Sequence, residues 1–145
     1  MKVYIAARFK GAENKPEIES LCAAVRASGL KDFCFIRDVE NYEKTFFDNQ
    51  QGLWVRALQE MNACDAFLID ISDQPSGGRV IEAGIAYALK QPIFVLVKSG
   101  VQYKEIYDGI AALVITYDDY SDIIEPLKNY LEPDKIPSVR LLQKL

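Results

Sequence analysis

Short apolar segments alternate with amphipathic ones along the chain. Segments with the length and composition of buried strands occupy residues 2–7, 32–38, 66–71, 92–97 and 112–117. Apolar residues at helical spacing lie between or after them, over residues 16–28, about 52–62, from Ser76 on, near 102–110 and about 120–131. Nearly continuous apolar strands separated by helices predict a parallel sheet with both faces covered and right-handed crossovers. We therefore expect one doubly wound α/β domain over residues 1–145, flavodoxin-like or Rossmann-like, with five parallel strands.

Local signals support individual elements of this scheme. Pro16 suits the first turn of a helix and Gly29 suits its end, which makes residues 16–28 a clear amphipathic helix. Residues 39–50 have no clean period and are long for a connection. A long loop in a compact domain is more often functional than accidental, so we expect this segment to have a functional role.

Composition and charge narrow the possible partners. The longest apolar run, residues 92–97, is far shorter than the roughly 20 residues that span a bilayer, and the N-terminal sequence MKVYIAARF lacks the plan of a signal peptide. We expect a cytoplasmic protein without a membrane partner. The net charge is -4 and no basic run occurs, which argues against a nucleic-acid polymer as the main partner.

The inventory of reactive side chains is restricted. Cys22, Cys34 and Cys64 are widely spaced in apolar surroundings, so we expect reduced core residues rather than a disulfide or a metal site. The chain has no histidine, which removes Ser-His and Cys-His pairs, histidine metal ligands and a histidine base. Any acid-base chemistry must use carboxylates, tyrosine, lysine or cysteine, and we expect no metal or other cofactor.

A glycine turn follows the strand that ends near Ile71. Ligands of doubly wound folds bind outside the carboxyl ends of the strands. At that end, Ser76, Gly77 and Gly78 begin a helix, and their hydroxyl and free amides could bind an anion. The turn matches neither a dinucleotide fingerprint nor a phosphate-binding P-loop, so ordinary turn chemistry is the alternative.

Glu82 lies in the first turns of the same helix. It borders an apolar stripe that we expect to face the sheet, formed by Ile81, Ile85, Ala88 and Leu89. A carboxylate there is partly desolvated, while the nearby helix N-terminus favours its anionic form. Such a group can act as a nucleophile or general base. The alternative is a solvated glutamate paired with Arg79.

The chain resembles the nucleoside 2-deoxyribosyltransferases and the related 2'-deoxynucleoside 5'-phosphate N-hydrolases. The resemblance rests on VYIAARF in the first strand, on AFLIDISDQPSGGRVIEAGIAYAL and on PIFVLV, with a central motif formed by Asp70, Ser76, Gly78, Glu82, Gly84 and Ala88. It implies that Glu82 attacks the anomeric carbon of a nucleoside or nucleotide and expels the base. A glycosyl-enzyme intermediate would then react with water or another base.

Further site residues follow from the same resemblance. Tyr4 matches a tyrosine that orients the catalytic carboxylate, and Ser76 stands where the nucleotide hydrolases have a serine near the 5'-phosphate. Ala7, Arg8 and Lys10 follow the first strand and complete the expected substrate-binding set. Arg8 and Lys10 would supply positive charge, with Arg79 as a weaker third candidate, although each residue taken by itself is better interpreted as a solvated cation.

The chain also departs from the family pattern. The helix before the motif strand has Arg56 near the position of an aspartate that helps to protonate the base. Asp70 or Asp73 could take that role, but Asp70 could equally cap the turn. The missing aspartate is compatible with an alternative function, a non-catalytic nucleotide-binding or signalling module on the same fold. A further alternative is a receiver-like domain phosphorylated at Asp70. This chain, however, lacks the acidic pair after the first strand that would hold Mg²⁺ in such a domain.

We expect a homodimer or a higher homo-oligomer. The resemblance implies a site that is completed by a neighbouring subunit, and the chain has apolar residues that a small monomer does not readily hide. These are Phe46, Phe47, Trp54 and, in the tail, Val139, Leu141, Leu142 and Leu145. The alternative is that the tail covers the core of its own chain.

Overall fold

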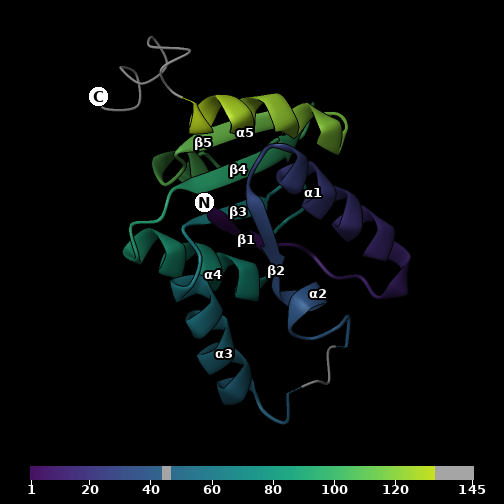
Figure 1. Cartoon of the computed structure of the whole chain (residues 1–145), viewed down its shortest axis with the longest axis vertical. Helices are drawn as coiled ribbons and strands as arrows, with labels where there is room; N and C mark the ends of the chain where they lie inside the picture. The colour runs from purple at the N-terminus through teal and green to yellow at the C-terminus, as the bar shows by residue number, and fades with distance from the viewer. Residues whose placement is uncertain (44–46, 133–145) are drawn as a thin grey trace.

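Five parallel strands form a single sheet. The structure is a computed structural model that describes residues 1–43 and 47–132. The strand order is β2-β1-β3-β4-β5, and every pair is parallel (Figure 1). The strands are β1 (Lys2–Ala6), β2 (Lys31–Cys34), β3 (Ala66–Asp70), β4 (Ile93–Lys98) and β5 (Leu113–Tyr117). The predicted doubly wound α/β fold with five parallel strands is confirmed.

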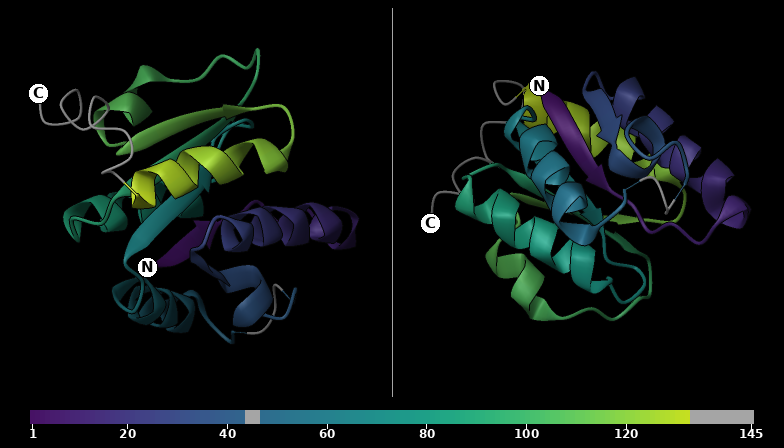
Figure 2. Two further views of the ribbon diagram at one scale, coloured as in Figure 1. Left: turned by 45° about the horizontal axis from the view of Figure 1, so that its top comes forward. Right: turned by 90° about the horizontal axis from the view of Figure 1, so that it is seen from below.

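Helices cover both faces of the sheet, as Figures 1 and 2 show. Helices α1 (Lys15–Ala27) and α5 (Ile124–Leu131) pack on one face, and α3 (Gln50–Asn62) and α4 (Gly77–Ala88) pack on the other. Shorter elements connect these layers: η1 (Ala12–Asn14), α2 (Phe35–Asp38), η2 (Glu105–Gly109) and η3 (Tyr120–Ile123). The two layers bury two separate apolar clusters, one on each side of the sheet.

The predicted second strand is wrong in its second half. Strand β2 ends at Cys34, the last residue paired with β1, and Phe35–Asp38 turn into the helix α2. The Asp38 carboxylate accepts a hydrogen bond of 2.9 Å from the Cys34 amide, which satisfies that donor as the chain leaves the sheet. Phe35 and Ile36 pack into opposite clusters, so their apolar character reflects burial on both sides rather than a continuing strand.

The face that α4 turns toward the sheet also differs from the prediction. Ile81 is 53% exposed and Leu89 is 39% exposed, so these two residues of the expected stripe face outward, whereas Ile85 is partly buried against the apolar cluster on this side of the sheet. The buried side chains of α4 are Arg79, Ala83 and Ala86. The outward stripe is apolar, and the inward face has the small residues Ala83 and Ala86, which let the helix approach the strands closely.

Two aromatic residues that we expected at the surface pack against their own chain. Trp54 and Phe47 are partly buried against the cluster under α3 and α4, and the Phe47 ring stacks on Phe35 with centroids 5.9 Å apart. Phe46 and the apolar tail residues lie outside the described residues. The three cysteines are buried and free, as predicted. Among the described residues, no helix is long and apolar enough to cross a membrane.

Strand alternation decides which side chains share a face. Tyr4 pairs in register with Phe67 of β3, and both lie in the cluster under α3 and α4. Asp70 is three residues beyond Phe67 and therefore points to the opposite face. The chain crosses from β1 to one side and from β3 to the other, so the carboxyl ends of these two strands form the switch point where doubly wound folds bind ligands.

Candidate active site

Tyr4 and Glu82 form the centre of the candidate active site. Tyr4 is fully buried on β1, and its ring lies between Phe33 and Phe67, at centroid distances of 5.5 and 5.9 Å. Its hydroxyl donates a hydrogen bond to Oε2 of Glu82, which is partly buried on α4. Two elements 78 residues apart in the sequence are thus joined at the predicted nucleophile.

Burial dominates the ionisation of Glu82. It raises the pKa of Glu82 to about 7, although the Tyr4 hydrogen bond and the positive charge of Arg79 lower the pKa and the charge of Glu40 raises it further. The desolvation of Glu82 therefore outweighs the hydrogen bond and the charge that favour its anionic form. A carboxylate with this pKa is populated in both protonation states near neutral pH, as a group that reacts or exchanges protons requires.

Tyr4 itself remains a hydrogen-bond donor. Burial, followed by the nearby charge of Glu82 and their hydrogen bond, raises the pKa of Tyr4 far above its usual value. The phenol is therefore neutral at physiological pH. Its rigid packing fixes the direction from which Glu82 receives this hydrogen bond, which leaves the other carboxylate oxygen outside that interaction.

Glu40 is a second carboxylate near Glu82 that the sequence did not single out. It follows α2, is 8% exposed, and anchors its backbone through a hydrogen bond of 3.1 Å from its amide to the Phe35 carbonyl. The next residues, Asn41 and Tyr42, have positive φ angles of 48° and 61°. The irregular 39–50 segment was a signal for function in this region, but only the fold brings Glu40 close to the charge of Glu82.

Arg79 is buried at the start of α4, beside the end of β3. It is 4% exposed, and its Nη1 donates a hydrogen bond of 3.0 Å to the Asp70 carbonyl at the end of β3. Its Nη2 lies 3.5 Å from Oδ2 of Asp73. The alternative of a solvated Arg79–Glu82 pair is therefore wrong, because Arg79 is enclosed and its ion pair is made with Asp73.

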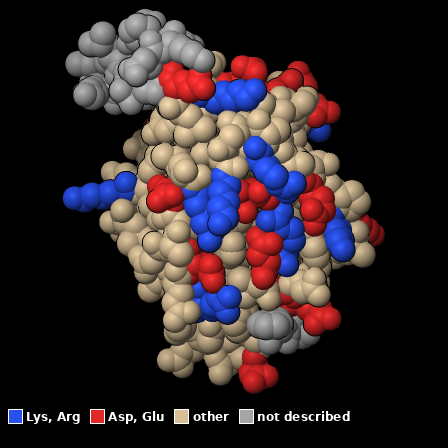
Figure 3. All heavy atoms as spheres, in the orientation of Figure 1, with Lys and Arg blue, Asp and Glu red and all other residues tan. Residues whose placement is uncertain are grey.

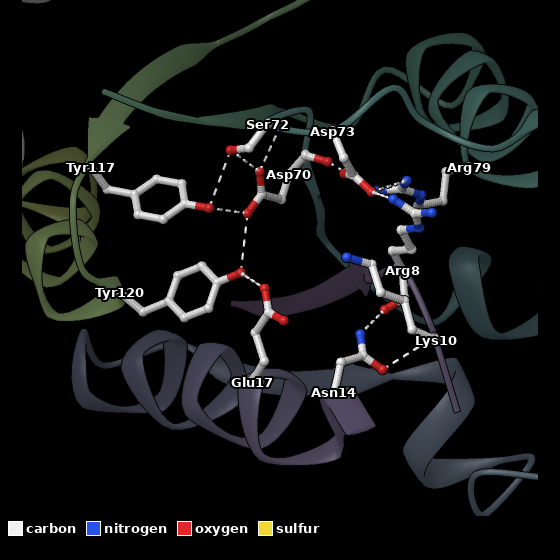
Figure 4. A network of polar contacts seen from close by, with 10 residues as sticks. All are labelled: Arg8, Lys10, Asn14, Glu17, Asp70, Ser72, Asp73, Arg79, Tyr117 and Tyr120. Atoms are coloured by element: carbon white, nitrogen blue, oxygen red, sulfur yellow. Dashed lines mark hydrogen bonds and ion pairs between the residues drawn. The ribbon is translucent and has the colours of Figure 1, made fainter. Parts of the chain in front are cut away.

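Asp70 lies on the sheet face opposite to Tyr4 and joins a network of polar side chains there (Figure 4). Its Oδ1 accepts hydrogen bonds from the amide and hydroxyl of Ser72, at 2.9 and 2.6 Å. Its Oδ2 accepts hydrogen bonds from the hydroxyls of Tyr117 and Tyr120. Both oxygens are engaged, and the bond to the Ser72 amide is the turn-capping arrangement. This geometry favours the turn-capping alternative over a proton-donor role.

A cleft of about 500 Å³ opens at the switch point, beside Asp70. It collects several residues of the predicted set, namely Ala7, Arg8, Lys10 and Asp70. Tyr4, Glu82 and the glycine turn are not among its lining residues. Arg8 forms an ion pair of 2.5 Å with Asp73 (Figure 4), and the Lys10 amide bonds the Asn14 side chain at 2.8 Å. The structure therefore divides the predicted residues between two adjacent regions.

The start of α4 leaves its donors accessible. Ser76 is the N-cap of this helix, and its side chain makes no capping hydrogen bond. A Cβ placed on Gly77 or Gly78 would meet no atom within 4 Å, so the space beside the backbone is open. Free amides at a helix N-terminus with open space beside them can bind an anion. Arg56, which the sequence placed near the position of the family's aspartate, forms an ion pair of 2.9 Å with Glu60 on α3.

The doubly wound fold places the tyrosine-bound Glu82 on α4, on one face of the sheet, and the switch-point cleft beside Asp70. Residues 3–129 match the nucleoside 2-deoxyribosyltransferase family, and the chain belongs to this family. It is accordingly an enzyme of the N-glycosidase or deoxyribosyltransferase type. Among the described residues, no cluster of cysteine, aspartate and glutamate side chains is suited to hold a metal ion.

Several solved structures share the fold. The CMP N-glycosidase BcmB of Clostridium botulinum is 20% identical, with a TM-score of 0.65 over 90% of this chain and 99% of the other. A 2-deoxyribosyltransferase of Bacillus psychrosaccharolyticus is 16% identical, with a TM-score of 0.67 over 86% and 90%. A conserved protein of Enterococcus faecalis V583 is 14% identical, with a TM-score of 0.70 over 89% and 98%. No curated protein sequence matches this chain.

Proposed function

We propose that the protein cleaves the N-glycosidic bond of nucleoside 5'-monophosphates, with Glu82 as the nucleophile. The observation that carries the proposal is the hydrogen bond from the buried Tyr4 hydroxyl to Glu82. It holds one oxygen of a partly buried carboxylate and leaves the other for attack. Family membership supports the reaction type, and the absence of histidine from the sequence is compatible with a carboxylate mechanism.

The chemistry proceeds in two displacements. A Glu82 oxygen forms a bond to the anomeric carbon as the carbon–nitrogen bond breaks, and the base leaves with the bonding electron pair and takes up a proton. Water then attacks the same carbon and releases the Glu82 carboxylate. Overall, water supplies the hydroxyl of the sugar and the proton of the base. A transition state with oxocarbenium character is stabilised by a nearby carboxylate, as in glycoside hydrolysis.

The 5'-phosphate is assigned to the start of α4. Ser76 offers a hydroxyl without a capping bond, and the open backbone at Gly77 and Gly78 offers amide donors. A serine at this position accepts a phosphate dianion, whereas an aspartate would repel it. The CMP N-glycosidase with a similar fold acts on a nucleotide, which agrees with this substrate class.

The reaction is tested by measuring free base. Incubation with a panel of nucleosides and 5'-nucleotides, followed by chromatography, should show base release from 5'-monophosphates. Glu82→Gln is nearly isosteric, so it should retain nucleotide binding while the rate falls by about three orders of magnitude or more. Glu125→Gln, at an exposed carboxylate on α5, is the matched control and should keep the rate. Nucleotide binding without any base release would instead favour a non-catalytic binding module.

The functional unit is proposed to be a homodimer that joins the outer surfaces of α3 and α4. Figures 1 and 2 show these helices side by side. Exposed apolar side chains occur on these helices and directly after α4, and we call this set the α3–α4 apolar face: Val55, Leu58, Val80, Ile81, Tyr87 and Leu89. A face of this kind is typical of a protein interface. Gly84, which is exposed and has open space around it, would allow close approach of a second helix.

A further inference from the structure

Neither aspartate that the sequence offered as a proton donor for the leaving base is suited to that role in the structure. Both oxygens of Asp70 already accept hydrogen bonds. Burial raises the pKa of Asp73, but the Arg8 hydrogen bond and the charge of Arg79 outweigh it and hold the pKa below its usual value. An acid that is ionised this strongly carries no proton to donate near neutral pH. The reaction proposed at Glu82 therefore needs another donor.

Glu40 is a buried carboxylate near the Tyr4–Glu82 pair. It is 8% exposed and directly follows Val39, which packs in the same apolar cluster as Tyr4. Ala83, the residue after Glu82, belongs to that cluster as well. The negative charge of Glu40 raises the pKa of Glu82, so the two carboxylates interact through space. Glycosidic bonds are commonly cleaved between two carboxyl groups, one of which attacks while the other donates a proton.

The turn after Glu40 has a strained backbone that several contacts hold in place. Asn41 and Tyr42 have positive φ angles of 48° and 61°, which is unusual for a side chain as large as tyrosine. The Tyr42 amide donates a hydrogen bond of 2.7 Å to the Ile36 carbonyl. The Tyr42 hydroxyl donates a hydrogen bond to the Glu19 carboxylate on α1. Strain of this kind persists only where the surroundings over-determine the conformation, and it is concentrated at functional sites.

Tyr42 anchors this turn to the layer that contains α1. Its ring packs against the apolar cluster of that layer and lies at a centroid distance of 5.9 Å from the Phe9 ring. The ammonium group of Lys15 lies 4.7 Å from the centre of the Tyr42 ring, which is a cation–π contact. These contacts fix the backbone two residues beyond Glu40 and thereby restrict where the Glu40 side chain can lie.

We propose that Glu40 donates the proton that the leaving base takes up, and that Tyr42 is its positioning residue. As the carbon–nitrogen bond breaks, its electron pair passes to the base, and the Glu40 carboxyl group gives its proton to that base. Glu40 then accepts a proton from the water that attacks the anomeric carbon, as Glu82 is released. Both carboxyl groups thus return to their starting states. The inference rests on the proposed reaction at Glu82 and names the proton donor that this reaction requires.

Glu40→Gln tests the proton donor when base release is compared for two leaving groups. The probes are 5'-monophosphates of uridine and 5-fluorouridine, or of guanosine and 7-methylguanosine, with the sugar that the original chain cleaves. The second member of each pair has a base that leaves with less need of a proton. Release from the first member should fall about 100-fold or more and release from the second by less than about fivefold. Loss of the Glu40 charge would by itself increase ionised Glu82, by at most about twofold at pH 7, so it cannot cause this fall.

The retained rate with the better leaving group also shows that the variant is folded. Glu43→Gln makes the same change at an exposed carboxylate of the same segment and should keep both rates. Tyr42→Phe removes the hydroxyl that anchors the turn, so it should lower release of the poorer leaving group severalfold and spare the better one. An equal fall for both leaving groups, or no fall in Glu40→Gln, would overturn the proposal alone. Absence of base release from the original chain would overturn the reaction at Glu82 and the proton donor together.

Discussion

Replacing Tyr4 with phenylalanine isolates the hydrogen bond on which the proposed nucleophile depends. The phenyl ring keeps the packing against Phe33 and Phe67, and only the hydroxyl that donates to Glu82 is removed. A hydrogen bond to a charged group contributes about 1.5–3 kcal/mol, and 1.36 kcal/mol corresponds to one pKa unit. Because the bond lowers the pKa of Glu82, its loss should raise that pKa from about 7 by about 1–2 units.

The effect on activity follows from the ionised fraction. About half of Glu82 is ionised at pH 7 in the original chain, and about 1–10% would be ionised in Tyr4→Phe. The rate of base release at pH 7 should therefore fall about 5- to 50-fold and should largely recover above about pH 9. The assay is the pH profile of kcat/KM for base release. A midpoint of the acidic limb that stays constant or moves to lower pH would refute this account of the Tyr4–Glu82 pair.

Stability gives an independent reading of the same pKa. The pKa of Glu82 is raised in the folded state from an ordinary value of 4.5 to about 7. The stabilisation of the fold by protonated Glu82 is therefore fully present below about pH 4.5 and is lost as pH rises to 7. The loss in the free energy of unfolding is about 3 kcal/mol by the same conversion. In Tyr4→Phe the loss should continue to higher pH. In Glu82→Gln this pH dependence should be absent from denaturant titrations.

Three further substitutions test the second carboxylate, the phosphate assignment and the proposed dimer surface. Glu40→Gln removes a negative charge that raises the pKa of Glu82, so the acidic limb of the activity profile should move to lower pH, opposite to Tyr4→Phe. Ser76→Asp should weaken nucleotide binding by charge repulsion and spare unphosphorylated nucleosides, and equal cleavage of nucleosides and nucleotides by the original chain would contradict the phosphate assignment. Ile81→Asp places a charge on the α3–α4 apolar face and should give monomers near 16.4 kDa in light scattering, whereas Glu125→Lys on the opposite layer should not.

The charge distribution agrees with a small ligand rather than a polymer. On the face shown in Figure 3, acidic and basic side chains are interspersed, without a broad basic patch. A nucleic-acid backbone would call for clustered positive charge. The cations at the carboxyl edge of the sheet are instead few and local, such as Arg8 and Arg79 around Asp73. We therefore expect a small ligand to be recognised by a few donors at the carboxyl edge of the sheet.

The order of strands and helices could be predicted from the sequence because it depends on local patterns. Buried parallel strands are apolar throughout, helices show a 3.6-residue period, and Pro16 and Gly29 mark the ends of a helix. The motif around Glu82 was likewise visible, and the predicted proximity of Tyr4 agrees with their hydrogen bond. Local pattern failed at Phe35–Asp38, because apolar residues that reach both clusters mimic a strand.

Only the tertiary structure decided how the site is divided. Helix α4 carries two plausible inner faces, and the choice of Arg79, Ala83 and Ala86 depends on how closely the helix packs on the strands. The register of β1 with β3 places Tyr4 and Asp70 on opposite faces, and no single segment contains that information. The pKa of Glu82 sums burial with the effects of Tyr4, Arg79 and Glu40. Such properties are set by distances between segments remote in the chain, because desolvation and electrostatic interactions act through space rather than along the sequence.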